Sequence, residues 1–340
     1  MLRLKLTSMF KGKKILITGG TGSLGKALAK RLLELDAEIV RIYSRNENKQ
    51  ISMQSEFNDE RLRYLIGDIR DLPRLIRAVE DIDIVFHAAA LKHVPVVEYN
   101  PYESIKTNVL GSQNVIDACL HENIETAICV GTDKAVSPLN TYGATKLLME
   151  KLFVTAGNYI NPEKHKTKFV AIRYGNVLAS SGSVIPHFLN QIKENKKLTI
   201  TDPTMTRFNI TMDQALDFII RTYQKGKGGE VFVPKLKAYR LGDLKDAIIN
   251  LAKKNVQSEI IPVRPGEKYH ESLINSDEIR NTFEDDDDYI ILQDHLQKRI
   301  EKMENLQKTE LKEQYSSDKV KLLTLEEIKQ ILLNEGILPI

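Results

Sequence analysis

The chain has 340 residues, of which 42% are hydrophobic and 28% charged, and its mean hydropathy is −0.29. This composition is typical of a globular chain with one substantial core and a smaller second lobe, and it excludes a disordered or fibrous protein. The 49 basic and 46 acidic side chains leave a net charge of +3, and no block of Lys or Arg is longer than a pair. We therefore expect no nucleic-acid partner and no polybasic membrane anchor.

The two cysteines, Cys119 and Cys129, lie in apolar stretches and lack the spacing of metal ligands. The N-terminus has no unbroken apolar segment followed by a cleavage site, and no apolar run approaches the roughly 18 residues that cross a bilayer. The sequence therefore predicts a cytoplasmic protein with no membrane attachment and no metal site.

Short β-branched runs alternate with longer helical patterns from Lys13 to about Asn176, as in a parallel sheet wrapped by helices. The predicted strands are Lys14–Thr18, Glu38–Tyr43, Tyr64–Ile66, Ile84–Ala88, Ala127–Val130 and Phe169–Arg173. Their continuous apolar character is typical of strands buried on both faces. The predicted helices between them are Leu24–Leu35, Leu72–Val79, Ser104–His121 and Tyr142–Asn158.

The pattern predicts an α/β fold with two parts. Residues 1–176 are expected to form a Rossmann-like, doubly wound parallel sheet, and residues 177–340 mainly a smaller C-terminal substrate-binding lobe and tail, with the chain crossing between the lobes. The acidic run Glu284 to Asp288 is typical of a solvated loop, because a flexible string of carboxylates has no fixed geometry for a cation. Thr324 with Glu327 three positions later predicts a capping box at the start of a final amphipathic helix.

A glycine-rich segment, Gly19-Gly20-Thr21-Gly22-Ser23-Leu24-Gly25, connects the first predicted strand to the first predicted helix. Glycines at this position let the backbone turn tightly and approach a pyrophosphate, whose charge the N–H groups and the helix dipole offset. Glycines also serve ordinary tight turns, but the order of strand, turn and helix favours a dinucleotide. The residues predicted to bind it here are Gly19, Thr21, Gly22, Ser23, Leu24 and Gly25.

The glycine spacing resembles that of the short-chain dehydrogenase/reductases, particularly the extended group that modifies sugar nucleotides. At the end of the second predicted strand, where an NAD enzyme carries a carboxylate for the ribose 2′-hydroxyl, this chain has Ser44, Arg45 and Lys49. A guanidinium and an ammonium suit a 2′-phosphate, so the sequence favours NADP. The alternatives are that both cations only solvate a loop, and that Glu47 makes NAD the cofactor.

Two further segments match cofactor positions of that superfamily. Asp68, followed by Ile69, matches the position that hydrogen-bonds the adenine amine. Ala88 and Ala89, with Ala90, match the small-residue run over which the cofactor lies. Small side chains at that place also suit simple packing.

A redox centre is predicted around Tyr142 and Lys146, which lie four residues apart on one face of a predicted helix. Lys146 at this spacing can lower the phenol pKa and bind the nicotinamide ribose. Tyr142 can then take the proton of a sugar hydroxyl as its carbon yields hydride to NADP. Thr132, at the end of the fifth predicted strand, can hydrogen-bond the substrate oxygen. A Tyr-x-x-x-Lys pair alone is weak evidence, and the glycine turn and Thr132 strengthen it.

Asp133 and Lys134 follow Thr132 and add an acid and a base to the redox groups. Once C4 of a sugar is a ketone, a neutral Lys134 can remove the C5 proton while a protonated Asp133 protonates the departing C6 hydroxyl. The hydride then returns to C6, so the net reaction is loss of water. The alternative is that Asp133 caps a loop and Lys134 is a surface charge.

The chain resembles the inverting UDP-N-acetylglucosamine 4,6-dehydratases from about Lys13 to Leu273. The matching segments are Gly19–Gly25, Tyr43–Arg45, Glu56–Asp59, Ala88–Pro95, Thr132–Ala135, Tyr142–Lys146, Arg173–Val177, Met205–Phe208 and Arg264–Lys268. The resemblance implies that Asp133, Lys134 and Tyr142 are the acid, base and redox tyrosine, and that the enzyme is a cytoplasmic homo-oligomer acting on UDP-N-acetylglucosamine.

The same resemblance implies further contacts. It assigns Lys92 to the cofactor and Asn176, Thr201 and Arg264 to the sugar nucleotide, although an asparagine or threonine in a loop more often satisfies backbone groups. Relatives commonly carry an arginine in the loop after Asn176, whereas residues 179–183 here contain none, so a phosphate contact from that loop is in doubt.

Two other functions remain open from the sequence. A sugar-nucleotide 4-epimerase that uses NADP or NAD needs Thr132, Tyr142 and Lys146 but no elimination pair. A redox-inactive NADP-binding protein on the same fold needs neither Tyr142 nor Lys146, and both are present.

Overall fold

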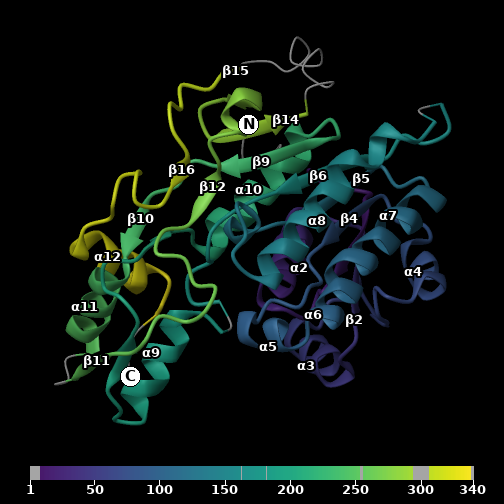
Figure 1. The fold of residues 1–340 in the computed structure, drawn as a ribbon. Coiled ribbons are helices and arrows are strands. Elements are labelled where there is room, and N and C mark those ends of the chain that lie inside the picture. The colour runs from purple at the N-terminus through teal and green to yellow at the C-terminus, as the bar shows by residue number, and fades with distance from the viewer. Residues whose placement is uncertain (1–7, 162, 181, 253–255, 294–305, 338–340) are drawn as a thin grey trace.

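The computed structural model describes residues 8–161, 163–180, 182–252, 256–293 and 306–337. Its largest element is a ten-stranded sheet in the order β15-β13-β14-β9-β6-β5-β4-β1-β2-β3 (Figure 1). In chain order its strands are β1 Lys14–Thr18, β2 Ile39–Ser44, β3 Leu62–Ile66, β4 Ile84–His87, β5 Thr126–Val130, β6 Lys168–Ile172, β9 Glu230–Pro234, β13 Thr282–Glu284, β14 Asp288–Leu292 and β15 Gln307–Lys308.

Seven neighbouring strands of this sheet, β9, β6, β5, β4, β1, β2 and β3, run parallel. Beyond β9, the strands β14, β13 and β15 extend the sheet in antiparallel pairs. The order β3-β2-β1-β4-β5-β6 is that of a doubly wound sheet, in which the strand order reverses between β1 and β4. The predicted α/β fold class is therefore confirmed. The reversal leaves a crevice at the carboxyl ends of the central strands, where such sheets bind ligands.

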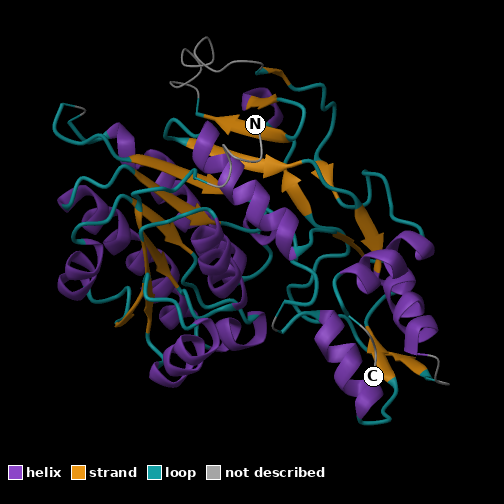
Figure 2. Cartoon of the chain, turned by 180° about the vertical axis from the view of Figure 1, so that it is seen from behind, coloured by secondary structure: helices purple, strands orange, loops and turns teal. Residues whose placement is uncertain are grey.

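Helices cover both faces of this sheet (Figure 2). They are α2 Ser23–Glu34, α3 Glu47–Phe57, α4 Leu72–Val79, α5 Val94–Tyr99, α6 Pro101–Ser104, the π-helix η1 Ile105–Leu110, α7 Gly111–His121, α8 Thr141–Thr155 and α10 Met212–Lys225, with short 3₁₀ turns at η2 Asp133–Ala135, η3 Ala156–Asn158 and η4 Ile279–Asn281.

The alternating side chains of β1 explain why both faces are covered. Ile15 and Ile17 are fully buried in one hydrophobic core together with Leu28 of α2. Leu16 points to the opposite face and is fully buried in a second core with Val115 of α7. Because successive strand residues face opposite sides, a strand that is apolar throughout needs a helical layer on each side.

The region predicted as one helix, Ser104–His121, is helical throughout, but the π-helix η1 interrupts the regular α-helix between α6 and α7. Asn108 explains the interruption. Its side-chain amide donates to Leu91 O at 2.9 Å, and its Oδ1 accepts from Leu91 N at 2.8 Å. A π-helical turn often marks such a side-chain requirement.

A smaller lobe follows the main sheet. It contains α9 Val184–Lys193, α11 Leu241–Ala252, α12 Leu325–Asn334 and the strand pairs β7 Leu198–Ile200 with β11 Ser258–Ile260, β8 Thr206–Phe208 with β10 Ala238–Arg240, and β12 Ser272–Ile274 with β16 Tyr315–Ser316. The predicted capping box is confirmed, since Thr324 Oγ1 accepts from Glu327 N and Glu327 Oε2 accepts from Thr324 N. The division of the chain at residue 176 stays a prediction. Strands β9, β13, β14 and β15, all from beyond that point, belong to the main sheet.

The acidic segment Glu284 to Asp288 is only in part the solvated loop that the sequence predicts: Asp286 and Asp287 are exposed, whereas its two ends lie in β13 and β14 and are buried. Asp288 is fully buried and pairs with Arg221 at 2.6 Å and Lys225 at 3.0 Å, while Glu284, 7% exposed, pairs with Lys235 at 2.7 Å. Cations on the neighbouring elements hold the carboxylates that face the sheet. In the described part of the chain, no cluster of His, Cys, Asp and Glu has a metal-binding arrangement, and no helix has the length and apolarity to cross a membrane.

A buried ion-pair network joins the sheet to the segment after β12. Arg173, 1% exposed, donates to both carboxylate oxygens of Glu150 on α8, each at 2.6 Å. It also donates to Glu278 at 2.7 and 2.9 Å and to Leu273 O at 3.0 Å. Because every donor of the guanidinium faces an oxygen, this network fixes the β12 segment against β6 and α8.

We predict that Arg173→Met lowers the free energy of unfolding by about 3 to 5 kcal/mol, because it leaves Glu150 and Glu278 buried without a counter-charge. Urea denaturation at pH 7 measures the effect. Arg77→Met is the control: Arg77 is 75% exposed and, among the described residues, forms an ion pair with Glu80 alone, so its loss is expected to change stability by less than about 0.5 kcal/mol. A similar, small change in both variants would contradict this account.

Candidate active site

A cleft of about 730 Å³ opens at the carboxyl ends of the central strands. All the residues that the sequence predicts as cofactor ligands line it: Gly19, Thr21, Gly22, Ser23, Leu24, Gly25, Ser44, Arg45, Lys49, Asp68, Ile69, Ala88, Ala89, Lys92, Tyr142 and Lys146. Thr132 and Asn176 line it too. The fold therefore brings the predicted cofactor residues and two further predicted site residues into one cavity.

The glycine turn forms the floor of the cleft at the start of α2. Gly19 has φ +69°, and a Cβ there would lie 2.9 Å from Ala89 Cα. A Cβ on Gly25 would lie 2.6 Å from Gly20 Cα. Both positions exclude a side chain, so the backbone itself lines the cavity. Gly22 is the N-cap of α2 and offers no side-chain cap, and the start of the helix lines the cleft, which suits an anion such as a pyrophosphate.

The residues predicted to bind a 2′-phosphate, Ser44, Arg45 and Lys49, line the cleft at and after the end of β2. Arg45 is 55% exposed, and its Nη1 lies 3.8 Å from Asp68 Oδ2. Lys49 lies in the first turn of α3, which the sequence analysis did not predict and which begins after the N-cap Asn46. Burial disfavours the Asp68 carboxylate, but its hydrogen bonds with Arg70 outweigh that effect and lower the pKa of Asp68. The exposed guanidinium of Arg45 after β2 thus lies near the ionised carboxylate of Asp68 after β3.

Tyr142 and Lys146 lie on the first turns of α8, whose N-cap Asn140 accepts from Gly143 N at 2.8 Å. Lys146 is 4% exposed and donates to Val130 O at 2.6 Å, and burial lowers its pKa to about 8. Burial raises the pKa of Tyr142 to about 12, and the charge of Lys134 and a hydrogen bond with Thr132 oppose that rise. Lys134 is thus a cation that lowers the pKa of the Tyr142 phenol, and the effect that the sequence assigns to Lys146 stays a prediction.

Asp133 and Lys134 form a buried pair beside the cleft, in the short turn η2 after β5. Asp133 is fully buried, and its Oδ1 accepts from Thr132 Oγ1 at 2.8 Å and from Lys134 Nζ at 3.1 Å. Lys134 Nζ also donates to Asn176 Oδ1 at 3.0 Å and lies 3.4 Å from Glu271 Oε1. The alternative that Lys134 is a surface charge is therefore wrong, because its side chain is 21% exposed and points into this group of oxygens.

The surroundings of Lys134 determine its charge. Burial disfavours the ammonium, but the charges of Asp133 and Glu271 outweigh burial and raise the pKa of Lys134 well above its usual value. The pair therefore rests as an ammonium and a carboxylate. The sequence hypothesis requires a neutral Lys134 and a protonated Asp133, and the 3.1 Å hydrogen bond is a direct route by which one proton converts the first form into the second.

Two residues assigned to the sugar nucleotide lie elsewhere. Thr201 follows β7 in the smaller lobe and donates to Met205 Sδ at 3.5 Å. Arg264 is exposed. Neither belongs to the described lining of the 730 Å³ cleft, and their roles stay predictions.

Sequence reasoning missed charged residues that surround Lys134 from the smaller lobe. Glu271 pairs with Lys134, and Arg207 on β8 donates to Tyr269 O at 3.0 Å and pairs with Glu267 at 3.2 Å. Lys268 Nζ donates to Val136 O, just beyond η2. A clue was present in the sequence, because Glu271 lies three residues after Arg264–Lys268, a segment that matches the family that the chain resembles.

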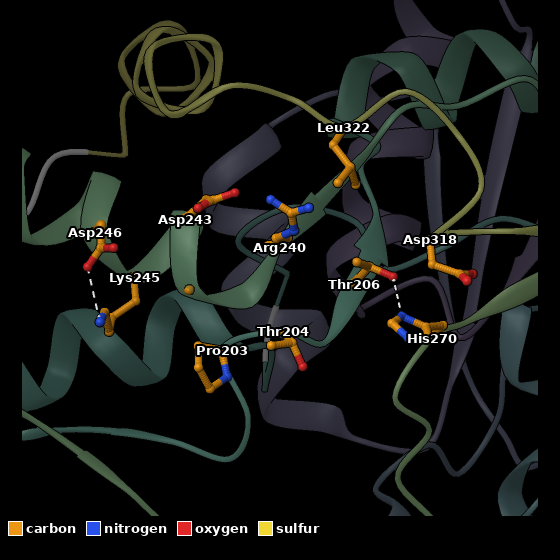
Figure 3. Close-up of a pocket in the computed structure, with 11 residues that line it drawn as sticks. Pro203, Thr204, Thr206, Arg240, Asp243, Lys245, Asp246, His270, Asp318 and Leu322 are labelled. Carbon is orange, nitrogen blue, oxygen red and sulfur yellow. Dashed lines mark hydrogen bonds and ion pairs between the residues drawn. The ribbon is translucent and has the colours of Figure 1, made fainter.

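A second cavity, of about 590 Å³, lies in the smaller lobe and is separate from the predicted residues (Figure 3). At its wall Thr206 Oγ1 and His270 Nδ1 lie 2.8 Å apart, and Lys245 pairs with Asp246. Its lining mixes acidic with basic side chains and includes none of the sequence-predicted site residues: it consists of Pro203, Thr204, Thr206, Arg240, Gly242, Asp243, Lys245, Asp246, His270, Asp318 and Leu322.

Comparison with known proteins places this geometry in a family context. Residues 15–293 match the family model described as polysaccharide biosynthesis protein. A UDP-N-acetylglucosamine 4,6-dehydratase (inverting) of Campylobacter jejuni is 48% identical over 83% of this chain and 84% of its own length. A UDP-glucose 4-epimerase of Rickettsia bellii is 41% identical over 96% of this chain and 97% of its own. The X-ray structure of Pen from Bacillus thuringiensis superposes with a TM-score of 0.90 at 41% identity, over 97% of this chain and 99% of that one.

We predict that Lys146→Met makes the protein about 1 to 3 kcal/mol more stable at pH 7. The folded pKa of Lys146, about 8, lies below the unfolded value near 10.4, so folding at pH 7 places a charge where burial disfavours it. Between about pH 8 and pH 10.4 the unfolded state binds one proton more than the folded state. The free energy of unfolding of the wild type therefore rises with pH in this range, and the stability advantage of Lys146→Met becomes smaller. Chemical denaturation at pH 7 and pH 10 measures both effects. A variant that is less stable than wild type at pH 7 would contradict the assignment.

Proposed function

This chain belongs to the family of polysaccharide biosynthesis proteins, and we propose that it is a sugar-nucleotide dehydratase that acts on UDP-N-acetylglucosamine. The product is a UDP-2-acetamido-2,6-dideoxy-4-keto-hexose with inverted configuration at C5. The observation that carries the proposal is the buried pair of Asp133 and Lys134, held by Thr132 and Asn176 beside Tyr142. Elimination of water needs an acid and a base together, and this pair supplies both.

The residues divide the reaction between them. Tyr142 takes the proton of the C4 hydroxyl, and Thr132 hydrogen-bonds the same oxygen. The glycine turn and Arg45 would hold NADP in the cleft, where the cofactor would supply the acceptance of a hydride from C4 and its return to C6. Lys134 takes the C5 proton, which the C4 ketone makes acidic, and Asp133 protonates the C6 hydroxyl as it leaves.

Proton counting supports this division. One proton moves from Lys134 Nζ to Asp133 Oδ1, across 3.1 Å, and creates the neutral amine and the carboxylic acid together. After elimination Lys134 holds the proton from C5 and Asp133 has lost its own to water. The pair thus returns to the ammonium and carboxylate form in which it rests. As the hydride reaches C6, C5 accepts a proton, and the one that Tyr142 took from the C4 hydroxyl balances the reaction.

The second candidate is a UDP-sugar 4-epimerase, which the name of the Rickettsia relatives supports. Epimerisation uses Thr132, Tyr142 and Lys146 and needs no group that removes the C5 proton. Epimerisation needs neither an acid at C6 nor a base at C5, which the buried pair of Asp133 and Lys134 could supply, so we favour the dehydratase.

NADP is the proposed cofactor because the guanidinium of Arg45 at the end of β2 suits a 2′-phosphate. The tight glycine turn and the uncapped start of α2 fit the pyrophosphate of either nicotinamide dinucleotide. NAD is the alternative, since Asp68 lies 3.8 Å from Arg45 and offers an ionised carboxylate at the same end of the cleft.

We further propose a cytoplasmic homo-oligomer. Large apolar side chains of α5, α6 and α8 and the adjoining loop are exposed, which supports a contact between copies. They include Val96 at 58%, Tyr99 at 88%, Tyr102 at 65%, Leu139 at 64% and Leu148 at 50% exposure.

We expect Arg45→Ala to weaken NADP binding about 10- to 100-fold and to leave NAD binding nearly unchanged, because one charge-assisted contact to the 2′-phosphate is lost. Titration calorimetry with each dinucleotide measures the affinities. Arg63→Ala is the matched control, since Arg63 is an exposed arginine on β3 outside the cleft lining. Equal losses for both dinucleotides, or tighter binding of NAD by the wild type, would refute the NADP assignment.

The reaction itself is tested by incubating the protein with UDP-N-acetylglucosamine and NADP in deuterated water and reading the product by NMR. A 6-methyl-4-keto sugar with deuterium at C5 and inverted configuration is expected. Lys134→Ala should reduce its formation by at least about 10³-fold, because the base is removed, whereas Lys30→Ala, an exposed lysine of α2, should not. A C4-epimerised sugar formed equally by wild type and Lys134→Ala would establish the epimerase instead.

A further inference from the structure

Glu271 lies in the smaller lobe immediately before β12, and its carboxylate pairs with Lys134, the partner of Asp133. Its side chain is 4% exposed, and Oε1 lies 3.4 Å from Lys134 Nζ. The other oxygen, Oε2, is buried and has no hydrogen-bond partner in the described part of the chain. Since buried carboxylate oxygens are normally hydrogen-bonded, this arrangement points to a role for the charge itself.

The C-terminal tail holds Glu271 in place through its main chain. Ser317 N donates to Glu271 O at 2.8 Å, and Glu271 N donates to Ser317 Oγ at 2.9 Å. Ser317 Oγ in turn donates to Thr206 O on β8 at 3.1 Å, and β16 pairs with β12 directly beyond. The tail residues around Ser317 therefore fix the position of the carboxylate relative to Lys134.

The oxygens around Lys134 Nζ match the donors of an ammonium. Asp133 Oδ1, Asn176 Oδ1 and Glu271 Oε1 lie at 3.1, 3.0 and 3.4 Å. An ammonium has three N–H groups and no lone pair, so Lys134 in this arrangement is not yet a base. One proton must leave Nζ first. Asp133 is the carboxylate at hydrogen-bond distance, and Glu271 is the carboxylate that remains charged beside the neutral amine.

We propose that Glu271 is a positioning residue for Lys134: it keeps a fixed negative charge beside Nζ and stabilises the ammonium that forms when Lys134 takes the C5 proton. The inference rests on the proposed dehydratase function. In that step the C5–H bond breaks, its proton goes to Nζ, and its electron pair forms the C5–C6 double bond. The C6–O bond breaks, and the oxygen leaves as water with the proton of Asp133.

The other charged and titratable groups around Lys134 define what Glu271 contributes. Those that interact with this cluster come from η2, α8, β8, β10 and the loop before β12: Asp133, Tyr142, Arg207, Tyr239, Lys268 and Glu271. Arg207 disfavours the ammonium, and Asp133 and Glu271 favour it. Once Asp133 is protonated, Glu271 is the carboxylate in this group that still carries charge.

Titration of Lys134 tests the proposal without any turnover. In NMR spectra of protein labelled with ¹³C- and ¹⁵N-lysine, the Lys134 signal is identified as the one that is missing from the spectrum of Lys134→Arg. In Glu271→Gln the midpoint of that signal is expected to fall by one pH unit or more, and Glu271→Asp is expected to restore part of the shift. Glu284→Gln, which changes a carboxylate of similar burial paired with Lys235, is the control and should leave Lys134 unchanged. An unchanged midpoint in a folded Glu271→Gln protein overturns the proposal.

Kinetics provide the second readout. Glu271→Gln is expected to lower kcat about 100-fold with little change in KM, as for removal of one preorganised charge. The alkaline limb of its pH profile should move to lower pH, because Lys134 loses its shared proton more easily. Loss of activity with no movement of this limb indicates a merely structural role and overturns the proposal. If the wild type forms no dehydrated product, the dehydratase assignment fails, and the Lys134 titration still decides the role of Glu271.

Discussion

An ammonium group enclosed by two carboxylates and an amide oxygen is the interaction on which the site depends. A buried charge is tolerated only where partners replace its hydration, and Lys134 draws these partners from three separate segments. Asp133 comes from η2 and Asn176 from the loop after β6. Glu271 immediately precedes β12, and its main chain is hydrogen-bonded to Ser317. The same contacts that stabilise the charge therefore join the smaller lobe to the carboxyl edge of the sheet.

The doubly wound sheet explains why these segments meet. β5 and β6 are parallel neighbours, so Thr132 to Lys134 and Asn176 emerge side by side at one edge. Arg173, at the end of β6, anchors the segment after β12 through Glu278 and Leu273. The glycine turn after β1 opens at the same edge. A cofactor site and an acid–base pair thus share one edge because both follow the ends of parallel strands.

Much of this arrangement could be predicted from the sequence. Every predicted strand of the first half overlaps an observed one, and β1 matches its prediction at both ends. Buried parallel strands and a glycine turn leave strong local patterns, which is why every predicted cofactor residue lies in the lining of the cleft. The interruption of the helix before α7 was missed because it depends on a distant contact of Asn108 with Leu91. Glu271 was missed for the same reason, since only the folded chain places it beside Lys134. The burial of Asp288 was missed because its partners, Arg221 and Lys225, lie on α10, far from it in the sequence.

The central claim is that Lys134 and Asp133 act directly on C5 and C6 of the sugar. A crystal structure of the protein with UDP-N-acetylglucosamine and the oxidised dinucleotide measures it most directly. The account predicts Lys134 Nζ within about 3.5 Å of C5 and a carboxylate oxygen of Asp133 within about 3 Å of the C6 oxygen, the separations of reacting and hydrogen-bonded atoms. A bound sugar whose C5 and C6 both lie more than about 6 Å from these two side chains, beyond any direct proton transfer, would contradict it.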